Sequence, residues 1–273
     1  MLRLAVRVAA ADAELVLAQL LDLAPSGVEE VDLGDVVEYA VYGSPGELPA
    51  LPDLTAAAGS ALIEVTTREL PDDWEERWRE FHRPLVLGER LTVRPPWEPQ
   101  GTNSIDIVID PGQAFGTGAH ATTRLCLELL LELEAGGELV DLGCGSGVLA
   151  ITAARLGYAP VVALDNDPLA VAATLQNAQR NGVALQVARH DLRTDPPACA
   201  TTVTANLLGP LLRDWAAHLR AGGVRPGRVI ASGLLASEAD AISAVFAPVG
   251  LRETARRAGG DWAALLLVDN ATG

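Results

Sequence analysis

The sequence contains no lysine: all 20 of its basic residues are arginines, against 36 aspartates and glutamates. The resulting formal net charge of −16 argues against binding of nucleic acid over a broad surface, because phosphate backbones attract basic proteins. We therefore expect no direct nucleic-acid binding. A cationic partner suits this charge better.

Cysteine is also scarce. The three residues of this type, Cys126, Cys144 and Cys199, are widely separated and form no C-x-x-C motif. They indicate neither a disulfide framework nor a thiolate zinc site, and the histidines are not spaced as metal ligands either. We expect no bound metal and a reducing, cytoplasmic location.

Long apolar runs are missing as well. No stretch approaches the ~20 apolar residues that a membrane helix requires. Residues 1–24 superficially resemble a signal peptide, but Arg7 and Asp12 interrupt the apolar stretch. This segment is better explained as a strand, a turn and an amphipathic helix. We expect neither export nor membrane association.

Charge and periodicity divide the chain into three segments. Residues 1–70 hold 3 arginines and 12 acidic residues, and their order of strand, helix, strand, strand, helix, strand predicts a small ferredoxin-like α+β domain. Residues 71–100 predict a linker, with a charged helix at 72–82 followed by a proline-rich extended connection. Residues 101–273 alternate strands with helices, which is typical of an α/β domain with a doubly wound parallel sheet.

The third segment should contribute seven strands. We place these strands at 105–109, 139–142, 161–164, 185–188, 203–205, 229–232 and 263–268. The helices between them fall near 122–135, 147–156, 168–181, 209–220 and 237–247.

A glycine-rich turn carries the strongest chemical signal. In residues 138–147, ELVDLGCGSG, an apolar strand ends near an acid and is followed by three alternating glycines that enter a helix. Glycines permit positive φ and close approach of a ligand, and the helix N-terminus offers unpaired N–H donors. The spacing differs from the dinucleotide pattern G-x-G-x-x-G, and the Asp141 carboxylate would repel a pyrophosphate. It would suit the ammonium and sulfonium of S-adenosylmethionine, so we expect Asp141, Gly143 and Gly145 at a site for that methyl donor.

Polar residues end two further strands and should face the same pocket. Asp165 is placed to accept hydrogen bonds from both ribose hydroxyls of a nucleoside, whereas Asp167 is better explained as the N-cap of the next helix. The side-chain carbonyl of Asn206 can accept N–H bonds from a neutral amine and aim its lone pair, as methyl transfer to nitrogen requires. The alternative for Asn206 is an N-cap of the following helix.

Residues 110–123, DPGQAFGTGAHATT, are rich in glycine and threonine and directly precede a helix. One interpretation is a lid over the cofactor, with Phe115 covering the sulfonium through a cation–π contact. The plainer alternative is that Thr122 or Thr123 is a simple N-cap. For His120 a structural and a catalytic role both stay open.

Together these motifs resemble those of the ribosomal protein L-eleven methyltransferases (PrmA). The segments that carry the resemblance are, in chain order, DPGQAFGTGAHATTRLCLELL, LVDLGCGSGVLAITAARLG, ALDNDPLAVAATLQNAQRNGV and TANLLGPLL, and DDWEERWREFHRPLVLGERLTVRPPWE is similar to the linker of that family. The resemblance covers about residues 72–235 well and reaches residues 1–70 only through architecture. It implies a small substrate-recognition domain joined to a seven-stranded, Rossmann-like domain that uses S-adenosylmethionine.

The resemblance also implies an activity. It predicts a protein N-methyltransferase acting on lysine ε-amino and N-terminal α-amino groups of ribosomal protein L-eleven, with a monomeric enzyme. By position, Thr123, Gly143, Asp165 and Asn206 match the cofactor-binding residues of the family, and Asn206 would also orient the amine. The acidic first segment would then steer a basic ribosomal protein, although a merely solvated surface explains its charge equally well.

Alternative functions stay open at this point. A methyltransferase of the same fold could act on another protein or on a small-molecule amine, although the glutamine-modifying enzymes usually carry Asn-Pro-Pro-Tyr where this chain has Asn206 followed by Leu-Leu-Gly. The glycine spacing and Asp141 disfavour an NAD-dependent oxidoreductase. An alternative from a different class also stays open: a non-catalytic ribosome-assembly module that binds the cofactor.

Overall fold

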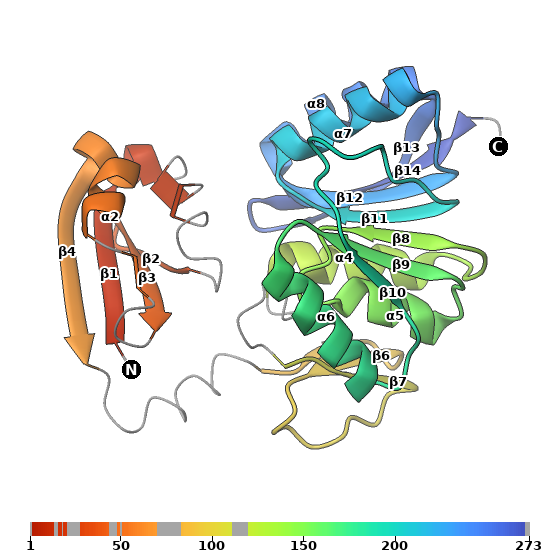
Figure 1. Ribbon diagram of the computed structural model, residues 1–273, viewed down its shortest axis with the longest axis horizontal. Helices are drawn as coiled ribbons and strands as arrows, with labels where there is room; N and C mark the ends of the chain where they lie inside the picture. The colour runs from red at the N-terminus through yellow and green to blue at the C-terminus, as the bar shows by residue number, and fades with distance from the viewer. Residues whose placement is uncertain are drawn as a thin grey trace. The chain divides into compact units, whose positions relative to one another are not determined.

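The computed structural model describes residues 2–13, 16–17, 19–20, 28–43, 48–49, 51–69, 83–110 and 120–270. These residues form two compact units, 2–69 and 83–270 (Figure 1). The predicted linker helix at 72–82 and the predicted cofactor contact Phe115 lie outside the described residues. None of the helices in the described ranges is long and apolar enough to cross a membrane.

The first unit is built on a four-stranded antiparallel sheet. Its elements are β1 (Leu2–Ala9), a 3-10 turn (Ala10–Asp12) leading to helical residues at 13, 16–17 and 19–20, β2 (Glu29–Asp32), β3 (Val36–Gly43), α2 (Leu51–Ala58), a second 3-10 turn (Gly59–Ala61) and β4 (Leu62–Glu69). The strand order β2-β3-β1-β4 is the ferredoxin-like arrangement that the sequence predicts. Because side chains alternate along β1, Leu4, Val6 and Val8 share one core with Leu20 and Leu54 of the helical segments.

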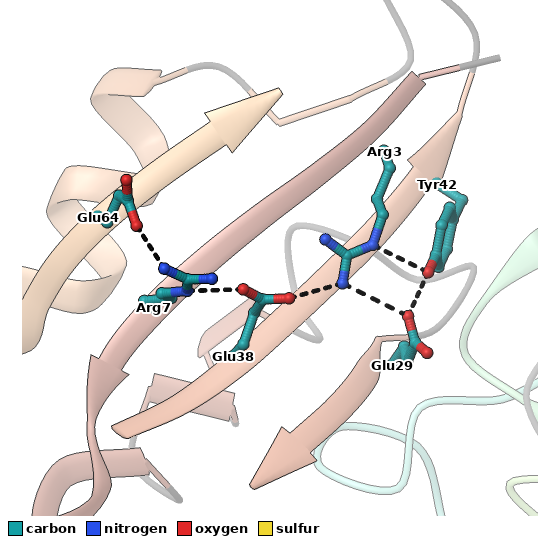
Figure 2. Close-up of polar contacts among 6 residues, drawn as sticks. All are labelled: Arg3, Arg7, Glu29, Glu38, Tyr42 and Glu64. Atoms are coloured by element: carbon teal, nitrogen blue, oxygen red, sulfur yellow. Dashed lines mark hydrogen bonds and ion pairs between the residues drawn. The ribbon is translucent and has the colours of Figure 1, made fainter. Parts of the chain in front are cut away.

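The other face of this sheet carries a ladder of polar side chains. Figure 2 shows its members, which are Arg3, Arg7, Glu29, Glu38, Tyr42 and Glu64. Glu38 is the central acid: Arg3 and Arg7 each donate to one of its carboxylate oxygens at 2.7 Å, and only 8% of the residue is exposed. Hydrogen bonding from Arg3 lowers the pKa of Glu38 in spite of the opposing effect of burial. Three acids of this acidic segment are therefore paired with two arginines within the sheet.

Glu38→Gln should destabilise the first unit by about 1–2 kcal/mol at neutral pH, because hydrogen bonds between charged partners are lost. The folded pKa of Glu38 lies below its unfolded value, so its stabilisation is present above the ordinary glutamate pKa and disappears as pH falls through the folded pKa. The variant should therefore lose stability less steeply on acidification than the wild-type protein does. Amide hydrogen exchange of β1 and β3 between about pH 5 and pH 2, where such a carboxylate takes up its proton, measures this. Glu64→Gln is the control, since Glu64 has a half-exposed side chain and, among the described residues, pairs with Arg7 alone. An equal effect of both substitutions would contradict the central role of Glu38.

The second unit contains a seven-stranded sheet in the order β10-β9-β8-β11-β12-β14-β13. The strands are β8 (Leu139–Leu142), β9 (Val161–Asp165), β10 (Gln186–Arg189), β11 (Thr202–Asn206), β12 (Arg228–Leu235), β13 (Leu251–Gly259) and β14 (Trp262–Asp269). Five of them run parallel, and β14 is antiparallel to both of its neighbours. This arrangement confirms the prediction of a Rossmann-like α/β unit with a largely parallel sheet.

Helices cover both faces of this sheet (Figure 1). They are α4 (Ala121–Glu132), α5 (Val148–Leu156), α6 (Pro168–Arg180), α7 (Gly209–Gly222) and α8 (Ala239–Phe246), with 3-10 turns at Ala236–Glu238 and Ala247–Val249. Apolar residues of α4 and α5 belong to one core, and those of α7 and α8 belong to the other. The helix after β8 and the helix after β11 therefore leave the sheet on opposite faces. The carboxyl ends of β8 and β11 are therefore the place in the strand order where open α/β sheets bind ligands.

Two of the strand predictions need correction. The strand expected at 105–109 is β7 (Ile105–Val108), which pairs in parallel with β6 (Leu91–Arg94) in a separate three-stranded sheet completed by β5 (Leu85–Leu87). The proline-rich stretch predicted as an extended connection thus contains two strands. The seventh place in the large sheet belongs to β13, whose sequence LRETARRAG is too polar to predict a buried strand. As an edge strand paired only with β14, β13 tolerates charged side chains at its outward positions.

Candidate functional site

The glycine-rich turn joins β8 to α5 at the carboxyl edge of the sheet. The amides of Gly143 and Cys144 both donate to the Leu164 carbonyl of β9, at 2.8 and 3.0 Å, which fixes the start of the turn. Gly143 has a φ of +69°, and a Cβ at this position would lie 2.5 Å from Cδ2 of Leu207. The positive φ favours glycine here, and the close contact places the turn directly against the residue that follows Asn206.

Asp165 ends the neighbouring strand β9 and contacts the same turn. Its Oδ2 accepts a hydrogen bond from the Gly145 amide at 2.9 Å, and its Oδ1 accepts one from the Asp167 amide at 3.0 Å. Burial raises the pKa of Asp165, while these backbone hydrogen bonds lower it. Each carboxylate oxygen keeps a lone pair for a further donor. Asp167 is the N-cap of α6, as predicted, and accepts from the Leu169 amide at 2.8 Å.

Asn206 ends β11, the strand that pairs with β8 on the side away from β9. Its Nδ2 donates to Oγ1 of Thr123 at 3.4 Å. In the part of the chain that the structure describes, the buried Oδ1 of Asn206 has no hydrogen-bond partner. The alternative role of Asn206 as a helix cap is wrong, because the N-cap of α7 is Leu208. A buried carbonyl oxygen left without a donor marks a place where an external N–H group would be favourable.

The start of α4 brings Thr123 to the side-chain amide nitrogen of Asn206. The N-cap of α4 is His120, whose Nδ1 accepts from the Thr122 amide at 3.3 Å, so the prediction that a threonine caps this helix is wrong. Burial lowers the pKa of His120, which favours the neutral ring that a capping acceptor requires. The ring packs edge-on against Trp262 with centroids 4.9 Å apart. These contacts give His120 a structural role and leave Thr123 buried beside Asn206.

Asp141 lies deeper than the sequence pattern suggests. It is 1% exposed; Oδ1 accepts from the Thr204 hydroxyl at 2.7 Å and Oδ2 from the Ala150 amide in the first turn of α5 at 3.2 Å. Burial raises the pKa of Asp141 to about 7 against these hydrogen bonds. Asp141 thereby ties β8 to β11 and to the helix that follows the turn. Its partner Thr204 has no local sequence signal, because the pairing depends on strand order.

The backbone after Asn206 is also held closely by β12. The Leu207 amide donates to the Ser232 carbonyl at 2.9 Å, next to a bulge at Gly233. Gly233 has a φ of +81°, and a Cβ there would lie 2.6 Å from the Leu207 carbonyl oxygen. Sequence reasoning missed this glycine because the close approach joins two separate strands.

Gly233→Ala should destabilise the second unit by about 2–4 kcal/mol, because an unfavourable positive φ adds to a clash with backbone that cannot rotate away. Gly223→Ala is a matched control, since Gly223 has a φ of +66° with nothing within 4 Å of the added carbon. That control should cost only about 1–2 kcal/mol, the price of the backbone conformation. Urea denaturation of the two variants measures the difference. Equal losses would show that the approach of β12 to Leu207 has no energetic importance.

Comparison with known proteins agrees with this geometry. The family model for ribosomal protein L11 methyltransferase (PrmA) matches residues 51–270. A ribosomal protein L11 methyltransferase from Pelotomaculum thermopropionicum is 42% identical over 208 residues, covering 74% of this chain and 67% of the relative. One from Aliivibrio salmonicida is 43% identical over 223 residues, covering 78% of this chain and 74% of the relative.

A solved structure shows the same relationship. The ribosomal protein L11 methylase from Lactobacillus delbrueckii subsp. bulgaricus matches with a TM-score of 0.61 and 27% identity, and the match covers 69% of this chain and 98% of that chain. The family match extends over both the glycine-rich turn and Asn206. This chain belongs to the ribosomal protein L11 methyltransferase family.

Proposed function

We propose that this protein transfers methyl groups from S-adenosylmethionine to lysine ε-amino and N-terminal α-amino groups of ribosomal protein L11. The observation that carries the proposal is the buried Oδ1 of Asn206, which has no partner among the described residues and lies at the carboxyl edge of β11. An acceptor in this position suits an amine, which offers N–H donors. Membership of the family supplies the reaction class and the protein substrate.

The residues around the glycine-rich turn fit S-adenosylmethionine, which supplies an electrophilic methyl group when bound. Asp165 offers two carboxylate oxygens to ribose hydroxyls, and Gly143 and Gly145 bring backbone close to the ligand without side chains. Thr123 is a further residue that we propose contacts the cofactor. Phe115, which the sequence predicts to cover the sulfonium, lies outside the described residues. Asp141 would act by holding the turn, because it is only 1% exposed and its oxygens accept from the Thr204 hydroxyl and the Ala150 amide.

Asn206 positions the amine of the substrate for methyl transfer. A free lysine has a pKa of ~10.4, so its amine is mostly protonated near neutrality and has no lone pair to attack with. Desolvation beside a cation lowers that pKa, and the proton leaves to water. Oδ1 of Asn206 then accepts an N–H bond from the neutral amine and directs its lone pair, while Thr123 holds the other end of the amide. Catalysis in this scheme is mainly positioning.

The first unit would recognise the substrate. Outside the ladder of Figure 2, residues 1–70 hold 1 arginine and 9 acidic residues. This excess of negative charge complements a basic ribosomal protein and would speed its encounter with the enzyme, an effect that salt screens.

Mass spectrometry of purified ribosomal protein L11, after incubation with this protein and S-adenosylmethionine, tests the proposal. Mass gains in steps of one methyl group, mapped to lysine or to the N-terminal amine, are expected. Cofactor binding by calorimetry without any mass gain would redirect the proposal to another amine substrate or to a non-catalytic role. Absence of both binding and transfer would overturn it.

A further inference from the structure

The inner face of α6 contacts the glycine-rich turn through side chains that the sequence motifs do not single out. The Thr174 hydroxyl donates to the Gly145 carbonyl at 2.9 Å. One turn later, Nδ2 of Asn177 donates to the Ser146 carbonyl at 2.9 Å. Thr174 and Asn177 are 0% and 1% exposed, so both hydrogen bonds are made in the interior. Two successive carbonyls of the turn are thus held by one helix.

Asn177 also reaches a second part of the chain. Its Oδ1 accepts from the amide of Asp110, just beyond β7, at 3.1 Å. Asn181, one turn further on, exchanges two hydrogen bonds with the backbone of Val108, at 2.8 and 2.7 Å. A single amide side chain therefore joins the glycine-rich turn to the end of the small sheet, whereas the side chain of Asn181 makes its hydrogen bonds, among the described residues, with the small sheet and its own helix.

We propose that Thr174 and Asn177 are positioning residues for cofactor binding, because they fix the carbonyl side of the turn whose Gly145 amide holds Asp165. The alternating glycines of the turn carry no side chains that could fix their backbone. If its carbonyls lose their donors on α6, the Gly145 amide and the Asp165 carboxylate lose their fixed relation. The cofactor must then order the turn on binding, which weakens affinity. This inference rests on the proposed cofactor.

Two equivalent substitutions on one helix separate this role from general stability. Asn177→Asp keeps the acceptor for the Asp110 amide but turns a carboxylate oxygen toward the Ser146 carbonyl. Asn181→Asp places the same new charge four residues away, where it keeps the acceptor for Val108 and touches no residue of the turn. Amide hydrogen exchange of the free protein and calorimetric titration with S-adenosylmethionine are measured for both variants.

Asn177→Asp should speed exchange of the Gly145 and Gly147 amides and weaken cofactor binding, each by about tenfold, as expected for one lost buried hydrogen bond. Asn181→Asp, which keeps the acceptor for the Val108 amide, should leave both exchange of the Gly145 and Gly147 amides and cofactor affinity within about twofold of wild type. Unchanged exchange in the turn of the first variant, or equal losses of affinity in both, would overturn the inference. If the wild-type protein fails to bind the cofactor, the proposed function fails. The exchange data still test whether Thr174 and Asn177 fix the backbone of the turn.

A second pair of variants covers the case in which Asn177→Asp does not fold. Thr174→Val keeps the shape of the side chain but removes the donor to the Gly145 carbonyl, whereas Thr174→Ser keeps the donor and removes the methyl group. The inference requires faster exchange of the turn and weaker cofactor binding in the valine variant, with both restored in the serine variant. The reverse order would show that Thr174 acts only through packing.

Discussion

Asn206→Ala should slow methyl transfer to ribosomal protein L11 by about 10²-fold or more, because misplacement of an attacking group by ~1 Å already costs this much. The dissociation constant for S-adenosylmethionine should change by less than about threefold. The substitution removes the one buried oxygen at this edge that lacks a partner among the described residues. It leaves the glycine-rich turn and Asp165 in place. Single-turnover rates and calorimetric titration measure the two effects separately.

The control for this experiment is Asn103→Ala, which removes the same side chain from the loop between β6 and β7, where it donates to the Gly88 carbonyl. This variant should transfer methyl groups at the wild-type rate. Full activity of Asn206→Ala would sink the assignment of Asn206 to the amine. A loss of cofactor affinity as large as the loss of rate would instead make Asn206 a residue of the cofactor site.

Asp165→Ala should weaken S-adenosylmethionine binding by about 10–100-fold, because hydrogen bonds to a charged acceptor contribute ~1.5–3 kcal/mol. The carboxylate also accepts from the Gly145 amide, so its removal frees the turn at the same time. The proposed ribose contact and the turn are thus lost together. Calorimetric titration of the variant with the cofactor gives the change directly.

Asp167→Ala, two positions away, should lower stability and leave cofactor binding unchanged. Its carboxylate caps α6 through the Leu169 amide, and loss of an N-cap costs about 1 kcal/mol of stability. Urea denaturation should detect this loss, while cofactor affinity should stay within about twofold of wild type. If Asp167→Ala weakened binding as strongly as Asp165→Ala, the distinction between a binding acid and a capping acid in this segment would be wrong.

Local patterns predict the glycine-rich turn and the ends of β9 and β11 well. The alternating glycines follow an apolar strand directly, and a polar residue at the end of a parallel strand faces the crevice by the geometry of the sheet. Asp165 and Asn206 therefore lie at the edge where the sequence predicts them. Their roles as cofactor and amine contacts stay predictions, to be decided by the variants above.

The sequence is less informative where a residue depends on distant partners. Asp141 has the spacing of a ligand-facing acid, yet it is buried, and its oxygens accept from Thr204 of a neighbouring strand and Ala150 of the next helix. In the same way, β7 has the pattern of a sheet strand but joins the small sheet, and the polar strand β13 takes a place in the large one. Periodicity reports which side of a strand is buried, and it carries no information about the neighbouring strand.

By itself, the sequence determined the order of elements, the ferredoxin-like and Rossmann-like units and the residues at the carboxyl edge, because spacing, glycine placement and apolar periodicity are local properties of the chain. Only the tertiary structure decided which polar atoms at that edge are already bound. Thr123 accepts from Nδ2 of Asn206, whose Oδ1 has no partner among the described residues, and side chains of α6 donate to two carbonyls of the glycine-rich turn. Hydrogen bonds between residues far apart in the chain form only once the strands and helices have packed, and their geometry is set by that packing.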